Sequence, residues 1–234
     1  SSLVSGLLDL VLDPAEPENH RSSAVAALLE LTPSLDEKEG RQVIDVLRPL
    51  AAGDYPASPF DQDEAHPFSA IRVSMHIDGS LRAAALQSVA RLLKRFPQLS
   101  GEWFPPLLFA ALVDDVARVQ RAGLLGAAEH PGLVPSVLIT RALRSERPFV
   151  RANAIRAWVA TGEELPDDAL ALTRDEAPIV RMTLAELGAH LPDIQRADLL
   201  SELSADPDPL VSFRAGLASG GPAAGASGSS ITSS

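Results

Sequence analysis

The most informative feature of the sequence is a hydrophobic pattern that returns every 30 or 31 residues. Four segments align without gaps, and each begins with a valine that is followed four residues later by a small or apolar residue. These pairs are Val119 and Gly123, Val150 and Ala154, Val180 and Leu184, and Val211 and Ala215. Residues four apart lie on one face of a helix, which is the face that a stacked repeat must bury. The period therefore predicts stacked helix pairs in which each segment is the second helix of its pair.

Two earlier segments extend the series towards the N-terminus. Leu81 with Ala85 forms a fifth copy, and His20 with Ala24 forms a weaker sixth. Each copy follows another helical pattern, so the unit is a helix–turn–helix. The expected helices are 2–12, 18–31, 36–51, 79–96, 102–113, 116–129, 132–144, 148–161, 166–173, 178–190, 193–204 and 208–218. The sequence thus predicts an all-α, right-handed α–α superhelix of about six helix pairs over residues 1–219.

Helix boundary signals agree with this division. Pro148, Pro178 and Pro209 open three of the second helices, at the first-turn position where the missing N–H has no helical partner to lose. Gly53 and Gly101 follow helix ends, where glycine accepts the left-handed conformation of a C-terminal cap.

Two segments fall outside the period. Residues 53–77 are an insertion between the two helices of the second pair. Residues 220–234 form a Gly/Ala/Ser-rich tail that cannot bury enough apolar surface to fold alone, so we expect it to be flexible.

The turn before each second helix carries a more specific pattern. The segments ERPFVRANAI and DEAPIVRMTL combine an acidic turn with Val-Arg and a small or apolar residue, and they resemble the HEAT-repeat family. The resemblance covers about residues 2–218. The high alanine and arginine content of the chain suggests a bacterial protein. It implies a ladder of hydrogen bonds between an arginine and a turn carboxylate, here Arg82, Arg151 and Arg181 with Asp78, Glu146 and Asp175. Gln120 and Ser212 replace the arginine, so we expect the ladder to be broken there.

Composition removes several classes of function. The chain has no cysteine, which excludes disulfides, thiolate nucleophiles and cysteine-based metal sites. No stretch approaches the ~20 apolar residues of a membrane-spanning helix. Since the N-terminal residues also lack a basic leader, the cytoplasm is the expected compartment.

Charge is unevenly distributed along the chain. Residues 79–156 carry 11 basic and 5 acidic residues, a net charge of +6, whereas the whole chain carries −11. Arg118, Arg121, Arg151 and Arg156 lie on predicted second helices, which line the concave, partner-binding face of HEAT solenoids. They are therefore candidates for binding, although the same arginines can instead complete the ladder or pair with nearby acids.

The insertion holds two further candidates. Tyr55, Phe60 and Phe68 are aromatic residues among prolines, which either anchor a partner or pin the insertion onto the solenoid. Asp61, Asp63, Glu64 and His66 could hold a divalent cation if the loop curled around it. No glycine enforces such a turn and the neighbouring prolines favour an extended path, so a solvated acidic loop is the preferred interpretation and no metal is expected.

No motif indicates catalysis or a cofactor. The chain contains no phosphate-binding loop, no GxGxxG and no GxSxG, so we expect no cofactor and no enzyme activity.

These features favour a non-catalytic protein–protein interaction scaffold, with a protein partner of unknown identity. The alternative is a binder of an anionic ligand or nucleic acid through a basic groove at residues 79–156. HEAT-like DNA glycosylases belong to this alternative and would need Trp103 or Trp158 beside Asp114 or Asp115 and an arginine, but Trp158 falls at core spacing from Val150. The isoelectric point of about 4.9 opposes nucleic-acid binding at long range.

Overall fold

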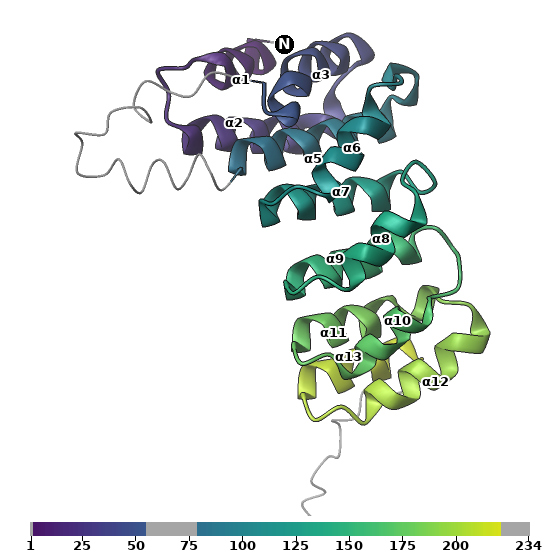
Figure 1. Ribbon diagram of the computed structural model, residues 1–234. Helices are drawn as coiled ribbons and strands as arrows, with labels where there is room; N and C mark the ends of the chain where they lie inside the picture. Colours follow the sequence, from purple (N-terminus) through teal and green to yellow (C-terminus); the bar gives the residue numbers. More distant parts are fainter. Residues whose placement is uncertain (1, 55–78, 221–234) are drawn as a thin grey trace, which may run out of the picture. The chain divides into compact units, whose positions relative to one another are not determined.

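The computed structural model describes residues 2–54 and 79–220, and within these ranges the chain is all-helical with no strand. It divides into two compact units, Ser1–Ile139 and Thr140–Ser234, which we call the first and second units (Figure 1). The predicted insertion at 53–77 and the predicted tail at 220–234 lie almost entirely outside the described residues. The prediction of an all-α fold built from helix pairs is confirmed.

The first unit contains three helix pairs. They are α1 (Ser2–Leu12) with α2 (Glu18–Leu31), α3 (Glu37–Ala52) with α5 (Ser80–Arg95), and α6 (Phe104–Leu112) with α7 (Ala117–Glu129). Helix α5 packs against both α2 and α7, so the second helices of the pairs form one continuous layer (Figure 1).

The second unit repeats the arrangement. Helix α8 (Ser136–Leu143) begins before the boundary and precedes α9 (Pro148–Val159), and α10 (Asp167–Leu170) continues as a 3-10 turn at Ala171–Arg174 before α11 (Pro178–Leu187). Helix α12 (Asp193–Ser204) then pairs with α13 (Pro209–Ala218). Helix α11 packs between α9 and α13, again as a layer of second helices (Figure 1).

Local signals set the helix ends. Asp36 and Glu39 form a reciprocal capping box at the start of α3, and Gly53 ends that helix with φ of 82°. Pro148, Pro178 and Pro209 each occupy the first turn of α9, α11 and α13, as expected. The predicted helices therefore match the observed ones to within four residues at every described end.

The repeated valines form the core of the stack. Leu81, Val119, Val150, Val180 and Val211 are each at most 1% exposed. A Cβ on Gly123, the small residue of its repeat, would lie 2.9 Å from the Ala111 side chain and 3.2 Å from the α6 backbone. His20 is the exception, because it is exposed and its Nδ1 contacts Glu16 at 3.0 Å.

Replacing Val180 by Ala should therefore cost about 1–3 kcal/mol of unfolding free energy, through lost burial and a residual cavity. Chemical denaturation of the full chain measures this loss. Val137 is 69% exposed, and Val137→Ala should change stability by less than about 0.5 kcal/mol. Equal effects of the two substitutions would contradict the assigned register.

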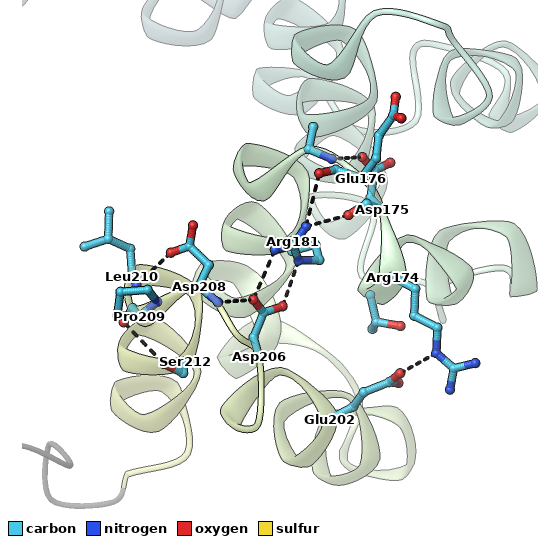
Figure 2. Close-up of polar contacts among 12 residues, drawn as sticks. Arg174, Asp175, Glu176, Arg181, Glu202, Asp206, Asp208, Pro209, Leu210 and Ser212 are labelled. Carbon is cyan, nitrogen blue, oxygen red and sulfur yellow. Dashed lines mark hydrogen bonds and ion pairs between the residues drawn. The ribbon is translucent and has the colours of Figure 1, made fainter.

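Arginines from the second helices form charged rungs to the following turn in the stack, as Figure 2 shows for Arg181 and Asp206. The Nε and Nη2 groups of Arg151 donate to both carboxylate oxygens of Asp175, each at 2.7 Å, and Nη1 donates to the Ser145 carbonyl oxygen. Arg181 repeats this geometry with Asp206, at 2.7 and 3.1 Å, and with the Asp175 carbonyl oxygen at 2.6 Å. Arg82 forms the corresponding ion pair with Asp114 in the first unit.

The residue that begins each repeat segment, a valine in four of them, is the anchor of its second helix. The acidic partner in each rung lies five residues before the anchor of the next pair, in the turn between its two helices. Asp114, Asp175 and Asp206 hold this position, and each also accepts the backbone N–H two residues further on. Ser145 holds it before α9 and keeps only the turn bond, to the Arg147 N–H. The sequence assignment of Glu146 to the ladder is therefore wrong, because Glu146 lies one residue past this position and is exposed.

Asp78, the other predicted partner, lies outside the described residues. Gln120 stands at the arginine position, as anticipated, and its side chain donates to the Leu112 carbonyl oxygen at 3.0 Å.

Hydrogen bonds in the rungs shift the pKa values of Arg151, Arg181 and Asp206. Hydrogen bonding to Asp175 raises the pKa of Arg151, and hydrogen bonding to Asp206 raises that of Arg181. The Arg181 hydrogen bonds lower the pKa of Asp206, and a bond from the Asp208 N–H acts in the same direction. The side chains of Arg181 and Asp206 are only 12% and 5% exposed, so each charge is stabilised mainly by the other and hardly by water.

Asp206→Asn should cost about 3 kcal/mol at neutral pH, because it leaves the buried Arg181 guanidinium without its counter-charge. The matched control is Glu202→Gln, which breaks the Arg174–Glu202 pair on the same unit. That pair is 84% and 41% exposed, so its loss should cost less than about 1 kcal/mol. Urea unfolding of the full chain compares the two.

The same pair predicts an acid sensitivity. Because folding lowers the pKa of Asp206, its contribution is complete above the unfolded value of about 3.9 and disappears as pH falls through the lower folded value. The stability difference between the native chain and Asp206→Asn should therefore shrink below about pH 4. A difference that stays constant down to pH 2 would contradict the rung.

Candidate binding groove of the first unit

The second helices of the first unit enclose a groove on their solvent side. It holds a pocket of about 500 Å³ between α2, α5 and α7. The lining residues are Glu18, Asn19 and Ser22 from α2, Ser80, Ala83, Ala84 and Gln87 from α5, and Arg118 and Arg121 from α7. All three helices belong to the compact first unit, so the groove is a property of that unit alone.

A second, smaller hollow continues along the same helices. Its volume is about 190 Å³ and it shares Gln87 with the larger pocket. Arg91 and Glu129 lie on its wall and contact each other at 3.5 Å, while the second carboxylate oxygen of Glu129 is buried without a hydrogen-bond partner in the described chain. The two hollows therefore form one groove that runs along α5.

Small side chains create the space. Ala83 and Ala84 of α5 present only methyl groups between α2 and α7, so the pocket lies directly over the middle helix. Longer side chains stand at its sides, since Arg118 and Arg121 are exposed on α7.

Several polar groups in the groove form no hydrogen bond within the described structure. The Ser22 hydroxyl is buried and makes no hydrogen bond there. The Gln87 amide and the Arg121 guanidinium also form no hydrogen bond or ion pair with described residues. Arg118 donates to the Ser80 hydroxyl at 3.3 Å, and Glu18 accepts the Leu81 N–H at 3.2 Å. The groove thus offers hydroxyl, amide and guanidinium groups to a polar or anionic ligand.

The predicted binding residues separate into four groups. Arg118 and Arg121 lie together on the groove. Arg151 is only 8% exposed and belongs to a rung, so it presents no surface to a partner. Arg156 lies in the second unit and its guanidinium contacts Thr183 and Glu186, both at 3.4 Å. The predicted aromatic anchors Tyr55, Phe60 and Phe68 lie outside the described residues.

The sequence interpretation missed Ser22 and Gln87. Both occupy fixed places in the repeat, since groove residues stand one before, two after and six after the anchor position. Ser80, Ala83 and Gln87 hold these places around Leu81, and Arg118, Arg121 and Leu125 hold them around Val119. This spacing is visible in the sequence once the groove face is known.

The other candidate chemistries find little support in the described residues. No cluster of three or more metal-ligating side chains occurs among them, and Asp61, Asp63, Glu64 and His66 lie outside. Trp158 is 8% exposed and donates to the Glu164 carbonyl oxygen, while Trp103 packs edge-on against Phe104 with Arg48 4.7 Å above its ring. Asp114 is ion-paired with Arg82. No described helix has the length and apolarity to cross a membrane.

Comparisons with known proteins add a fold. No family model and no curated protein matches the chain. Among 11 matching solved chains are crystal structures of two engineered proteins from the Northeast Structural Genomics Consortium, 16% and 15% identical with TM-scores of 0.53 and 0.52. The first match covers 92% of this chain and 96% of that one, and the second covers 93% and 97%. At these identities the likeness shows the fold alone.

Human deoxyhypusine hydroxylase in complex with glycerol is also similar, at 16% identity and a TM-score of 0.43, over 93% of this chain and 94% of that one. That protein is an enzyme, so our expectation that the chain is not an enzyme does not stand. The prediction rested on missing motifs, which do not exclude catalysis on such a fold. The chain is an all-helical protein whose helices pack in a solenoid-like arrangement.

Proposed function

We propose that the chain is a HEAT-type module that binds a segment of a partner protein in the groove of α2, α5 and α7. One observation carries the proposal: a pocket of about 500 Å³ combines the exposed Arg121 guanidinium with the unused polar groups of Ser22 and Gln87. The repeat period and the arginine–aspartate rungs support the HEAT assignment.

The arginine side of the groove favours an acidic side chain of that segment. Arg118 and Arg121 are three residues apart on α7, so both guanidinium groups project from the same helical face. A guanidinium binds a carboxylate through two parallel hydrogen bonds, and this geometry selects Asp or Glu. The Gln87 amide can meanwhile donate to and accept from a peptide backbone.

Charge favours a protein segment over nucleic acid. Residues 1–139 contain 11 basic and 18 acidic residues, a net charge of −7, and Glu18 and Glu129 lie in the groove itself. A row of phosphates would meet these carboxylates, whereas one acidic side chain can contact the arginines alone.

Two substitutions test the groove by different physical routes. Arg121→Glu reverses the charge of one side chain in the groove. Ala84→Phe fills the pocket and leaves the charge unchanged. Peptides selected from a random display library against the native chain should carry Asp or Glu, and each variant should weaken their binding at least about tenfold, equivalent to about 1.4 kcal/mol. Calorimetry should also show weaker binding at higher salt.

Arg141→Glu is the matched control, because Arg141 is exposed, forms no ion pair with described residues and makes the same change in charge. It should leave peptide affinity unchanged, and circular dichroism should show that all variants stay folded. Selected peptides that bind both groove variants as tightly as the native chain would remove this groove from consideration. Tighter binding of a single-stranded oligonucleotide, lost in Arg121→Glu, would replace the protein partner by an anionic polymer.

A further inference from the structure

The groove positions of the repeat carry different residues in the second unit. The groove positions are the residues one before, two after and six after the anchor. On α11 these are Ile179, Met182 and Glu186, and on α13 they are Leu210, Phe213 and Leu217. In the first unit the same places on α5 and α7 hold small, polar or basic residues, with Leu125 as the exception. The corresponding face of the second unit is therefore largely apolar.

Large apolar side chains on this face are open to solvent. Leu210 is 64% exposed, Phe213 45% and Leu217 49%, while Ile179 and Met182 are half-buried beside them on α11. We call these five residues the apolar stripe. Phe149, 61% exposed, holds the equivalent place on α9 and extends it.

The stripe contributes little to the core of the unit. Val211 and Ala215 are both fully buried and already provide the inward face of α13. Leu210, Phe213 and Leu217 follow a spacing of three and four residues, so they line one side of the helix. Because α11 and α13 are packed neighbours, their rows lie side by side. Continuous exposed apolar surface of this kind is typical of an interaction site.

The charges around the stripe are mostly negative. Residues 140–220 of the second unit contain 13 acidic and 9 basic residues, a net charge of −4. Glu176 and Asp208 stand within one turn before Ile179 and Leu210, and neither forms an ion pair with described residues. Arg214, beside Phe213, is the basic residue on the exposed part of α13. An occupant with an apolar face and basic flanks would match this surface.

We propose that the apolar stripe docks the apolar face of an amphipathic, lysine- or arginine-flanked helix of a partner protein. Helices bind exposed apolar surfaces through apolar anchors at positions i, i+3, i+4 and i+7, a spacing that matches the rows of α11 and α13. The basic flanks lie against Glu176 and Asp208. This site is separate from the groove of the first unit and differs from it in the chemistry it selects.

The test uses the full chain and a fluorescein-labelled 18-residue amphipathic peptide of leucine and lysine. Fluorescence anisotropy should show saturable binding that Phe213→Ser weakens at least tenfold and Leu210→Ser weakens less. Ile194→Ser is the matched control, because Ile194 on α12 is 76% exposed and outside the stripe, and it should bind as the native chain does. Arg121→Glu should also leave this binding unchanged, which separates failure here from failure of the groove.

Two further peptides define the specificity. A scrambled peptide of the same composition and an amphipathic peptide with glutamate in place of lysine should both bind at least tenfold more weakly. Equal binding of the scrambled peptide, or equal losses in Phe213→Ser and Ile194→Ser, would overturn the proposal. So would sedimentation showing a dimer of the native chain that Phe213→Ser converts to a monomer, since a second copy would then occupy the stripe.

Discussion

The buried rung between an arginine of one helix pair and an aspartate of the next sets the geometry on which the rest of each unit depends. Removing a guanidinium and a carboxylate from water costs several kcal/mol, and only close bidentate contact with further hydrogen bonds offsets it. Arg151 and Arg181 meet this requirement by also binding backbone carbonyls of the preceding turn. A repeat that slid or rotated would leave both charges buried without a partner. The rungs therefore hold neighbouring second helices in the alignment that places their exposed faces side by side.

The same requirement explains a coordinated departure from the pattern. Gln120 replaces the rung arginine on α7, and Ser145 replaces the rung aspartate before α9. Each makes a local bond instead, Gln120 to the end of α6 and Ser145 to its own turn, so neither replacement leaves an unpaired buried charge. Every rung among the described residues consequently lies within one compact unit.

Because packing is confined to the inward face, the outward positions of the second helices are free to differ. In the first unit alanines and a glutamine leave a polar pocket with arginines at its side. In the second unit leucine, isoleucine, methionine and phenylalanine fill the same positions and remain in contact with solvent. One helical architecture thus presents two surfaces of different chemistry, each formed by a few side chains that the core does not need.

The sequence by itself determined the helices, the inward face and the arginines of the ladder. Those features depend on residues three or four apart, whose contacts a helical period dictates, and Val150, Val180 and Val211 are buried accordingly. The sequence also named Asp175, but only the tertiary structure decided that Asp114 and Asp206 complete the other rungs and that Glu146 does not. The partners lie 24 to 32 residues apart, and a shift of one residue separates Ser145 from Glu146. It likewise decided that Arg151 is buried while Arg121 lies on a groove with Ser22 and Gln87. Such a groove depends on the distance between packed helices and on the size of the side chains between them. The repeat period of the sequence does not determine that distance.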